Sequence, residues 1–177
     1  MTEEHQRREV VRVAVVVGNP KAQSRTLGVA IAVADALAEG IAVRSERLVV
    51  DLAQEAAHLF DQSSERLSEL GTQVANSDLV VVASPTFKAT YTGLLKAFFD
   101  RYGYRPLEGC VVVPVMTGAG SAHALAVDVH LRPLLVELGA SVPTRGLYVT
   151  EAELPDLDGV VAGWAADAVP LVRRALG

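Results

Sequence analysis

Short runs of almost entirely apolar residues constrain the fold of this chain more than any other feature. The clearest are VRVAVVV at residues 11–17, DLVVVASP at 78–85 and GCVVVPVMTG at 109–118. Runs of strand length without polar alternation are typical of parallel strands that helices cover on both faces. Half of the residues are hydrophobic, mostly Ala, Val and Leu, and such small side chains suit helices packed closely on both faces of a sheet.

Helical patterns alternate with the apolar runs. We expect helices at about residues 24–39, 63–76, 91–102, 121–139 and 158–175. Two further strands are expected at 41–52, a more polar run suited to the region of a sheet edge, and at 141–149. This order predicts one α/β domain over residues 1–177, with a doubly wound parallel sheet of five strands in the order 2-1-3-4-5.

Glycine and proline residues predict where these helices end or bend. Gly40 and Gly139 follow the first and fourth helical patterns, where we expect them to act as carboxyl-terminal caps. Pro133 and Pro170 fall late in their helices, and proline at such positions kinks or shortens a helix.

Composition argues against several classes of function. A net charge of −5 without a basic tail makes nucleic acid an unexpected partner. No apolar run is long enough to predict a membrane span, and the charged start MTEEHQRREVVRV lacks the apolar centre of a secretory signal. The single cysteine, Cys110, lies in a strand pattern, so we expect an unreactive thiol and no internal disulfide. This cysteine usage fits a reducing compartment and predicts a cytoplasmic protein.

Three segments that follow strands contain no acidic residue. They are residues 18–34, which carry Lys21 and Arg25, residues 84–99, which carry Lys88 and Lys96, and residues 117–127. In the predicted strand order these segments meet at the carboxyl edge of the sheet, where the order reverses and ligands bind. Acid-free loops in an acidic protein predict an anion site there.

The first of these segments, GNPKAQSRT at residues 18–26, predicts how the anion is held. It lacks both the G-x-G-x-x-G spacing and the GK[ST] ending of the common nucleotide loops. Ser24, at or near a helix N-cap, and Thr26 can donate hydroxyl hydrogen bonds, and Arg25 adds a charge-assisted fork suited to a monophosphate. The alternative is that Ser24 and Thr26 only cap a helix.

The second segment, SPTFKATY, offers backbone groups at Thr86 and Phe87 to the polar edge of a heterocycle such as a flavin, and Phe87 or Tyr91 to cover a ring face. Alternatively, the aromatic stripe is core or a subunit interface; its members are Tyr91, Leu94, Leu95, Phe98, Phe99 and Tyr102. In the third segment, TGAGSAH, Gly118 and Gly120 permit the backbone to approach the ligand.

The chain resembles the NAD(P)H-dependent FMN reductases of flavodoxin-like fold in three stretches, GNPKAQSRT, SPTFKATYTGLLKAFFD and PVMTGAGSAHALAVDVHLRPLLVELGA. The third stretch resembles the reductase partners of alkanesulfonate-type two-component monooxygenases. The resemblance implies an FMN phosphate surrounded by Asn19, Lys21, Ser24, Arg25 and Thr26. It implies a flavin ring bounded by Pro85, Thr86, Phe87 and Lys88, with Thr117, Gly118 and Gly120 opposite.

The resemblance also assigns Tyr91 to a π-helical bulge near a subunit interface, a feature that accompanies flavin used as a released substrate. It implies a homodimer or homotetramer. Two residues depart from the family pattern, Asn19 in place of serine and Phe87 in place of tyrosine.

Three functions remain open. The favoured one is an oxidoreductase that transfers a hydride from NADPH or NADH to FMN and supplies reduced FMN to a flavin-dependent monooxygenase. The others are an FMN-retaining reductase of quinones, azo dyes or metal ions, and a flavodoxin-like electron carrier. We expect no side chain in a catalytic role, because the reacting atoms belong to the cofactors. No metal site is expected either, since the spacing of His123, Asp128 and His130 does not place them on one helical face.

Overall fold

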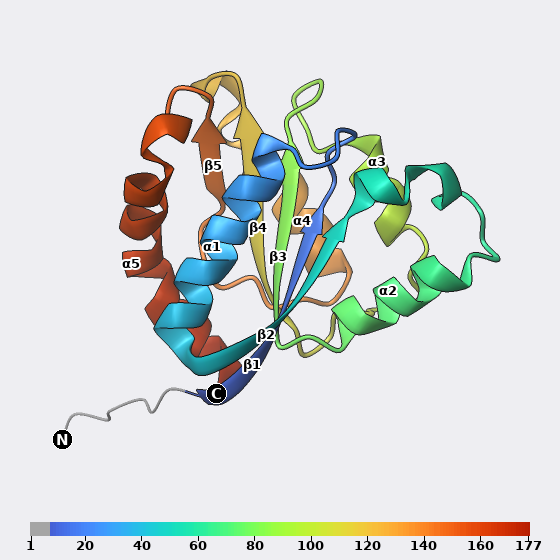
Figure 1. Cartoon of the computed structure of the whole chain (residues 1–177), viewed down its shortest axis with the longest axis horizontal. Helices are drawn as coiled ribbons and strands as arrows, with labels where there is room; N and C mark the ends of the chain where they lie inside the picture. Colours follow the sequence, from blue (N-terminus) through green and yellow to red (C-terminus); the bar gives the residue numbers. More distant parts are fainter. Residues whose placement is uncertain (1–7) are drawn as a thin grey trace.

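The structure, a computed structural model, describes residues 8–177 and has a single parallel sheet at its centre (Figure 1). The strand order is β2-β1-β3-β4-β5, which confirms the predicted fold class. The strands are β1 (Arg8–Val17), β2 (Ala42–Asp51), β3 (Leu79–Pro85), β4 (Val111–Gly118) and β5 (Leu147–Thr150). The first seven residues, on which part of the argument against a secretory signal rests, lie outside the described part.

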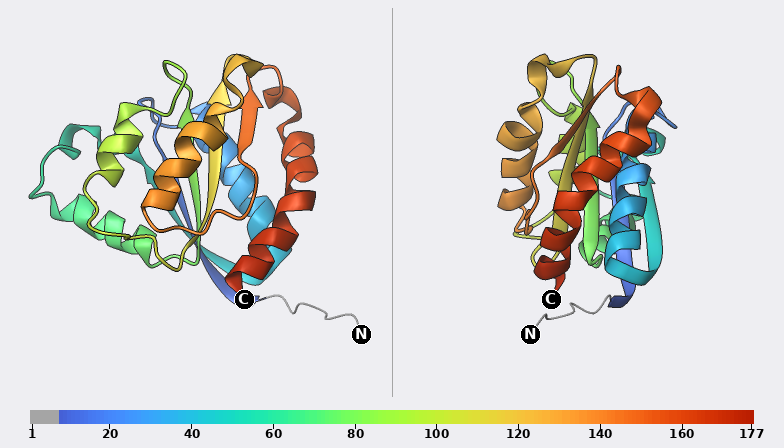
Figure 2. Two further views of the ribbon diagram at one scale, coloured as in Figure 1. Left: turned by 180° about the vertical axis from the view of Figure 1, so that it is seen from behind. Right: turned by 90° about the vertical axis from the view of Figure 1, so that its left-hand side faces the viewer.

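Helices cover both faces of the sheet (Figure 2). On one face lie α1 (Arg25–Ile41) and α5 (Leu157–Leu176), and on the other lie α2 (Glu65–Ala75), α3 (Gly93–Phe99) and α4 (Arg132–Glu137). Successive residues of a strand point to opposite faces. Val13 and Val15 accordingly pack toward α1 and α5, whereas Ala14 and Val16 pack toward the other layer. This arrangement explains why β3, β4 and the second half of β1 are apolar at nearly every position.

A hydroxyl side chain begins each of the first three helices. The Ser24, Ser64 and Thr92 oxygens accept hydrogen bonds from the N–H groups of Leu27, Leu67 and Leu95, respectively. Such caps satisfy donors that the helix cannot satisfy itself. The chain therefore turns from loop to helix at positions that the sequence determines locally.

The prediction that Gly40 caps the first helix is wrong. Helix α1 continues through Gly40 to Ile41, and the capping residue is Ala42, whose N–H donates to the Ala38 carbonyl. Gly40 lies against α5, where an added Cβ would come within 2.7 Å of both methyl carbons of Val169. The small residue serves close helix packing, and a glycine selected for packing looks the same in sequence as one selected for capping.

The third helix is shorter than predicted, and this corrects the assignment of Tyr91. Because Thr92 caps α3, Tyr91 precedes the helix and is not in a π-helical bulge. The rest of the stripe behaves as core. Leu95, Phe98 and Phe99 are buried, and Tyr91, Leu94 and Tyr102 pack against the same cluster.

The predicted helix at 121–139 is divided into three parts. A short 3-10 turn at Ser121–His123 is followed by a π-helical turn at Val127–Leu131 and then by α4. Among residues 8–177 the π turn lies at Val127–Leu131 and not at Tyr91, so the assignment of Tyr91 to such a turn is wrong. Pro133 lies in the first turn of α4 rather than late in a helix, and a missing N–H is tolerated at that position. Pro170 lies within α5 but does not end it.

The fifth strand is also shorter than predicted. Ser141 forms an isolated bridge to the sheet, and the chain rejoins the sheet only at Leu147. Between them, the Arg132 guanidinium donates to the carbonyls of Val142 (2.9 Å) and Thr144 (2.6 Å) and pairs with Asp128 of the π turn. Side-chain hydrogen bonds therefore replace the sheet ladder in this segment.

Cys110 is buried just before β4, and burial raises the pKa of its thiol. A thiol with a raised pKa is a poorer nucleophile at neutral pH, which supports the prediction of an unreactive cysteine. Within residues 8–177, no helix has the length and hydropathy needed to cross a bilayer.

Gly139 does act as the expected cap, and its role can be tested. Its φ is +90°, its N–H donates to the Val136 carbonyl, and the N–H of Ala140 donates to the Leu135 carbonyl. This pattern is a Schellman motif, which favours glycine. We expect Gly139→Ala to lower the free energy of unfolding by about 1–2 kcal/mol, because alanine is disfavoured at positive φ.

The matched control is Gly163→Ala in α5, where an added Cβ meets nothing within 4 Å. That change should raise the free energy of unfolding by about 0.5–1 kcal/mol, since alanine is the better helix former. Denaturant titration measures both changes. Equal effects of the two substitutions would contradict the assigned cap.

Candidate functional site

A cleft of 570 Å³ opens at the carboxyl edge of the sheet, within the usual size range of small-molecule sites. The first, second and third acid-free segments all contribute to its wall. The predicted site residues that line it are Asn19, Lys21, Ser24, Arg25, Thr26, Pro85, Thr86, Phe87, Thr117 and Gly118. Lys88, Tyr91 and Gly120 are not among the lining residues.

The first segment presents the amino end of α1 to the cleft. The Ser24 oxygen is committed to the N–H of Leu27 (3.2 Å), so the capping alternative correctly describes part of its role. Within the described chain, the N–H groups of Arg25 and Thr26 donate to no other residue. Two unpaired donors at a helix amino terminus are well suited to an anion.

Thr26 is buried and connects the first segment to the third. Its hydroxyl lies 2.8 Å from the Thr117 hydroxyl and accepts a hydrogen bond from the Asn19 side-chain amide (3.1 Å). The Asn19 side-chain oxygen in turn accepts from the N–H of Lys21 (2.9 Å). Asparagine at the position where the family has serine therefore links Lys21 to Thr26.

Gln23 adopts a left-handed conformation, with φ of 51°, immediately before the N-cap. Its N–H donates to the buried Asp51 carboxylate at the end of β2 (3.0 Å). This conformation is uncommon for a residue with a side chain, and such strain persists only where surrounding contacts hold it. Asp51 thus fixes the turn from which α1 begins.

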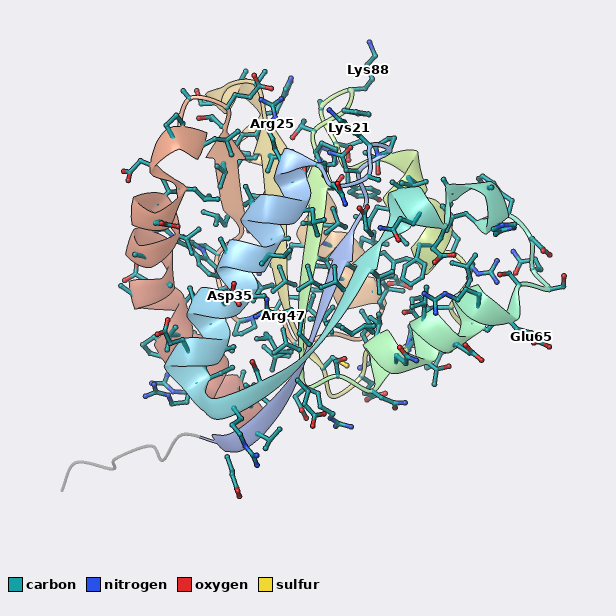
Figure 3. All side chains as sticks on the ribbon, in the orientation of Figure 1. Lys21, Arg25, Asp35, Arg47, Glu65 and Lys88 are labelled. Atoms are coloured by element: carbon teal, nitrogen blue, oxygen red, sulfur yellow. The ribbon has the colours of Figure 1, made fainter. Side chains whose placement is uncertain are left out.

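The second segment forms a tight reversal beside the cleft. Phe87 and Thr90 pair across it, and the two residues between them, Lys88 and Ala89, have φ of 52° and 69°. Figure 3 shows Lys88 pointing outward from the tip of this turn, while Arg25 and Lys21 lie lower at the same end of the molecule. Phe87 lines the cleft with 52% of its surface exposed.

Tyr148 connects the second and third segments. Its hydroxyl accepts a hydrogen bond from the Thr86 hydroxyl (3.3 Å) and donates to the Gly120 carbonyl (3.2 Å). The same hydroxyl lies so close to Gly118 that a Cβ there would overlap it. Gly118 is therefore required by an internal contact, whereas an added Cβ at Gly120 would meet nothing within 4 Å.

A fourth segment, at the end of β5 and just beyond it, was missed by the sequence reasoning. It contributes Val149, Glu151 and Leu154 to the lining of the cleft. Glu151 forms an ion pair with Arg25, with 2.6 Å between the carboxylate oxygen and a terminal guanidinium nitrogen. The signal was available, because the strand order places the end of the fifth strand at the same sheet edge.

The donor set fits a phosphate monoester attached to a flat ring. Arg25, Lys21 and the free N–H groups of α1 supply charge and donors at one side of the cleft. Phe87 and the backbone of the second segment border the other side. FMN has a terminal phosphate and an isoalloxazine ring that match these two sides.

A comparison with known families decides the relationship. Residues 11–153 match the family model described as NADPH-dependent FMN reductase. The chain belongs to this family. The resemblance predicted from the three motifs is thereby confirmed.

Individual relatives agree with this result. The chain is 36% identical over 149 residues to the NADH-dependent FMN reductase SfnF of Pseudomonas putida, covering 80% of this chain and 78% of that protein. It is 32% identical over 147 residues to an FMN reductase (NADPH) of Pseudomonas aeruginosa, with the same two coverages. The structure of NADH:FMN oxidoreductase EmoB in its apo form superposes with a TM-score of 0.73 at 28% identity, covering 89% of each chain.

The protein is therefore an NAD(P)H-dependent FMN reductase, an oxidoreductase whose small-molecule partners are FMN and NAD(P)H.

The contact between Gly118 and Tyr148 gives a test of how the cleft is built. Gly118→Ala should lower the free energy of unfolding by about 1–3 kcal/mol, because the new methyl group overpacks against the Tyr148 hydroxyl. Tyr148→Phe removes the overlapping oxygen, so it should recover part of this loss in the double variant. Thermal and denaturant unfolding of the four proteins measure the coupling. Strictly additive losses would contradict the assigned contact.

Proposed function

We propose that this FMN reductase binds FMN in the cleft at the carboxyl edge of the sheet and supplies reduced FMN to a partner flavin-dependent monooxygenase. The observation that carries the proposal is the meeting of a cationic helix terminus and an exposed aromatic turn in one open cleft. Arg25 keeps 67% of its side chain exposed and Phe87 52% of its surface. These groups are therefore accessible to an incoming flavin.

In this proposal the FMN phosphate lies at the start of α1. The N–H groups of Arg25 and Thr26 donate to it, the Arg25 guanidinium supplies a charge-assisted hydrogen bond, and Lys21 adds positive charge. Ser24 and Asn19 support this arrangement through the hydrogen bonds that hold the segment in shape. A monophosphate needs no metal ion to neutralise it here.

The flavin ring lies against the ends of the second and third segments. Pro85, Thr86 and Phe87 of the second segment and Thr117 and Gly118 of the third line this part of the cleft side by side, because the N–H of Thr86 donates to the Thr117 carbonyl (2.7 Å). Lys88, Tyr91 and Gly120 flank these residues. We assign them supporting roles, Lys88 at the tip of the strained turn and Gly120 through its hydrogen bond from Tyr148.

Bound FMN supplies the acceptor for a hydride from NAD(P)H, so the protein contributes position rather than acid–base chemistry. The cleft accordingly must hold the flavin ring in a defined plane and leave one face of the ring open to the nicotinamide. Thr86 and Thr117 hold the second and third segments together, and their hydroxyls contact Tyr148 and Thr26, respectively. Self-association into a homodimer or homotetramer stays a prediction, for which light scattering is the direct measurement.

The phosphate assignment is tested with two flavins that differ only in the phosphate. Arg25→Ala should weaken the binding of FMN by about 1.5–3 kcal/mol, because a charge-assisted hydrogen bond is lost. The binding of riboflavin should hardly change. Flavin fluorescence titration measures both dissociation constants.

Arg174→Ala, which removes an equal charge from an exposed position near the end of α5, is the matched control and should affect neither flavin. Equal losses for FMN and riboflavin in Arg25→Ala would contradict the phosphate assignment.

A further inference from the structure

Glu151 is the one carboxylate among the described residues that line the cleft, and it faces the residue best placed to hold a phosphate. Its carboxylate oxygen lies 2.6 Å from Nη2 of Arg25. Lys21 and Arg25 are the two cations of the same lining. The negatively charged side chain of Glu151 thus lies where the other residues of the site favour an anionic ligand.

One backbone hydrogen bond of Glu151, and side-chain hydrogen bonds between its neighbours, hold it in this position. The N–H of Glu151 donates to the Gly118 carbonyl of the third segment (2.9 Å). Two residues later, the Glu153 carboxylate accepts hydrogen bonds from the N–H (2.8 Å) and hydroxyl (2.7 Å) of Thr150. These bonds lower the pKa of Glu153. The ion pair is therefore built on a fixed turn.

The pair itself contributes little to stability. The two side chains keep 67% and 51% of their surface exposed, and exposed ion pairs contribute at most about 1 kcal/mol. A weak internal pair is one that an incoming phosphate can displace. After displacement the carboxylate remains close to the phosphate, and like charges in contact repel each other.

We propose that Glu151 is an internal competitor for the flavin phosphate. By pairing with Arg25 and repelling a phosphate beside it, Glu151 lowers the affinity for FMN and thereby favours exchange of the flavin. This inference rests on the proposed function, because it requires the phosphate to lie at Arg25. In this inference Glu151 lowers the affinity for FMN and so favours a flavin that is released over one that is retained.

The test is the isosteric change Glu151→Gln, with dissociation constants for FMN and riboflavin measured by fluorescence titration. FMN should bind about fivefold more tightly, the effect of about 1 kcal/mol of relieved competition and repulsion near the surface. Riboflavin binding should stay within twofold of the wild type. The gain should shrink at high salt, because salt screens exposed charges. Glu137→Gln on α4 removes the same charge from an exposed position outside the cleft and should leave both constants unchanged.

The Glu151→Gln substitution, made in Arg25→Ala protein, separates competition for Arg25 from other causes of tighter FMN binding. In Arg25→Ala protein the gain from Glu151→Gln should fall below twofold, since there is no guanidinium to compete for. Weaker FMN binding in Glu151→Gln would overturn the inference, because it would mean that Glu151 positions Arg25 for the phosphate. An equal gain for both flavins, or an equal gain in both backgrounds, would overturn it too.

The outcomes also separate this inference from the proposed function. If Arg25→Ala weakens FMN selectively but Glu151→Gln leaves its affinity unchanged, only the role of Glu151 is wrong. If wild-type protein does not distinguish FMN from riboflavin and neither variant changes this, the phosphate site itself is wrong.

Discussion

The geometry of the site depends on Gly18, because three contacts meet at this one residue without a side chain. Its N–H donates to the Ala83 carbonyl (2.8 Å), its carbonyl accepts from the Thr92 hydroxyl, and an added Cβ would overlap Leu95. These contacts fix the end of β1 against the end of β3 and the start of α3. The first and second segments consequently face each other at a set distance. The strand order has the same effect on a larger scale, since it brings the ends of β1, β3 and β4 to one edge.

The electrostatics of the cleft result from a balance rather than from positive charge alone. The amino end of α1, Arg25 and Lys21 favour an anion, and Glu151 opposes them. Tight retention of a cofactor requires a higher affinity for its phosphate than rapid exchange of a substrate does. In this protein one exposed carboxylate lowers that affinity without altering the fold, because the ion pair lies on the rim of the cleft and outside both apolar layers.

Much of the fold was predictable because its determinants are local. Apolar runs predicted β1, β3 and β4, a more polar run predicted β2, and β5 was predicted with too early a start. The Schellman cap at Gly139 was found where glycine follows the helix pattern. The errors occurred where tertiary contacts decide. Gly40 is small because Val169 packs on it, and the chain before Leu147 leaves the sheet because Arg132 binds its carbonyls. The convergence of the three segments followed from the strand order. Glu151 was missed because only acid-free segments were considered.

In the proposed function FMN is a substrate of this reductase, and the rate of NADPH and NADH oxidation in air by flavin-free protein, measured as FMN is added, tests this directly. We expect a rate that rises from near zero and saturates with FMN. Activity that needs only trace flavin but responds to an added quinone would contradict it and indicate a retained prosthetic group. Tight FMN binding without oxidation of either nicotinamide would contradict the assignment as a reductase.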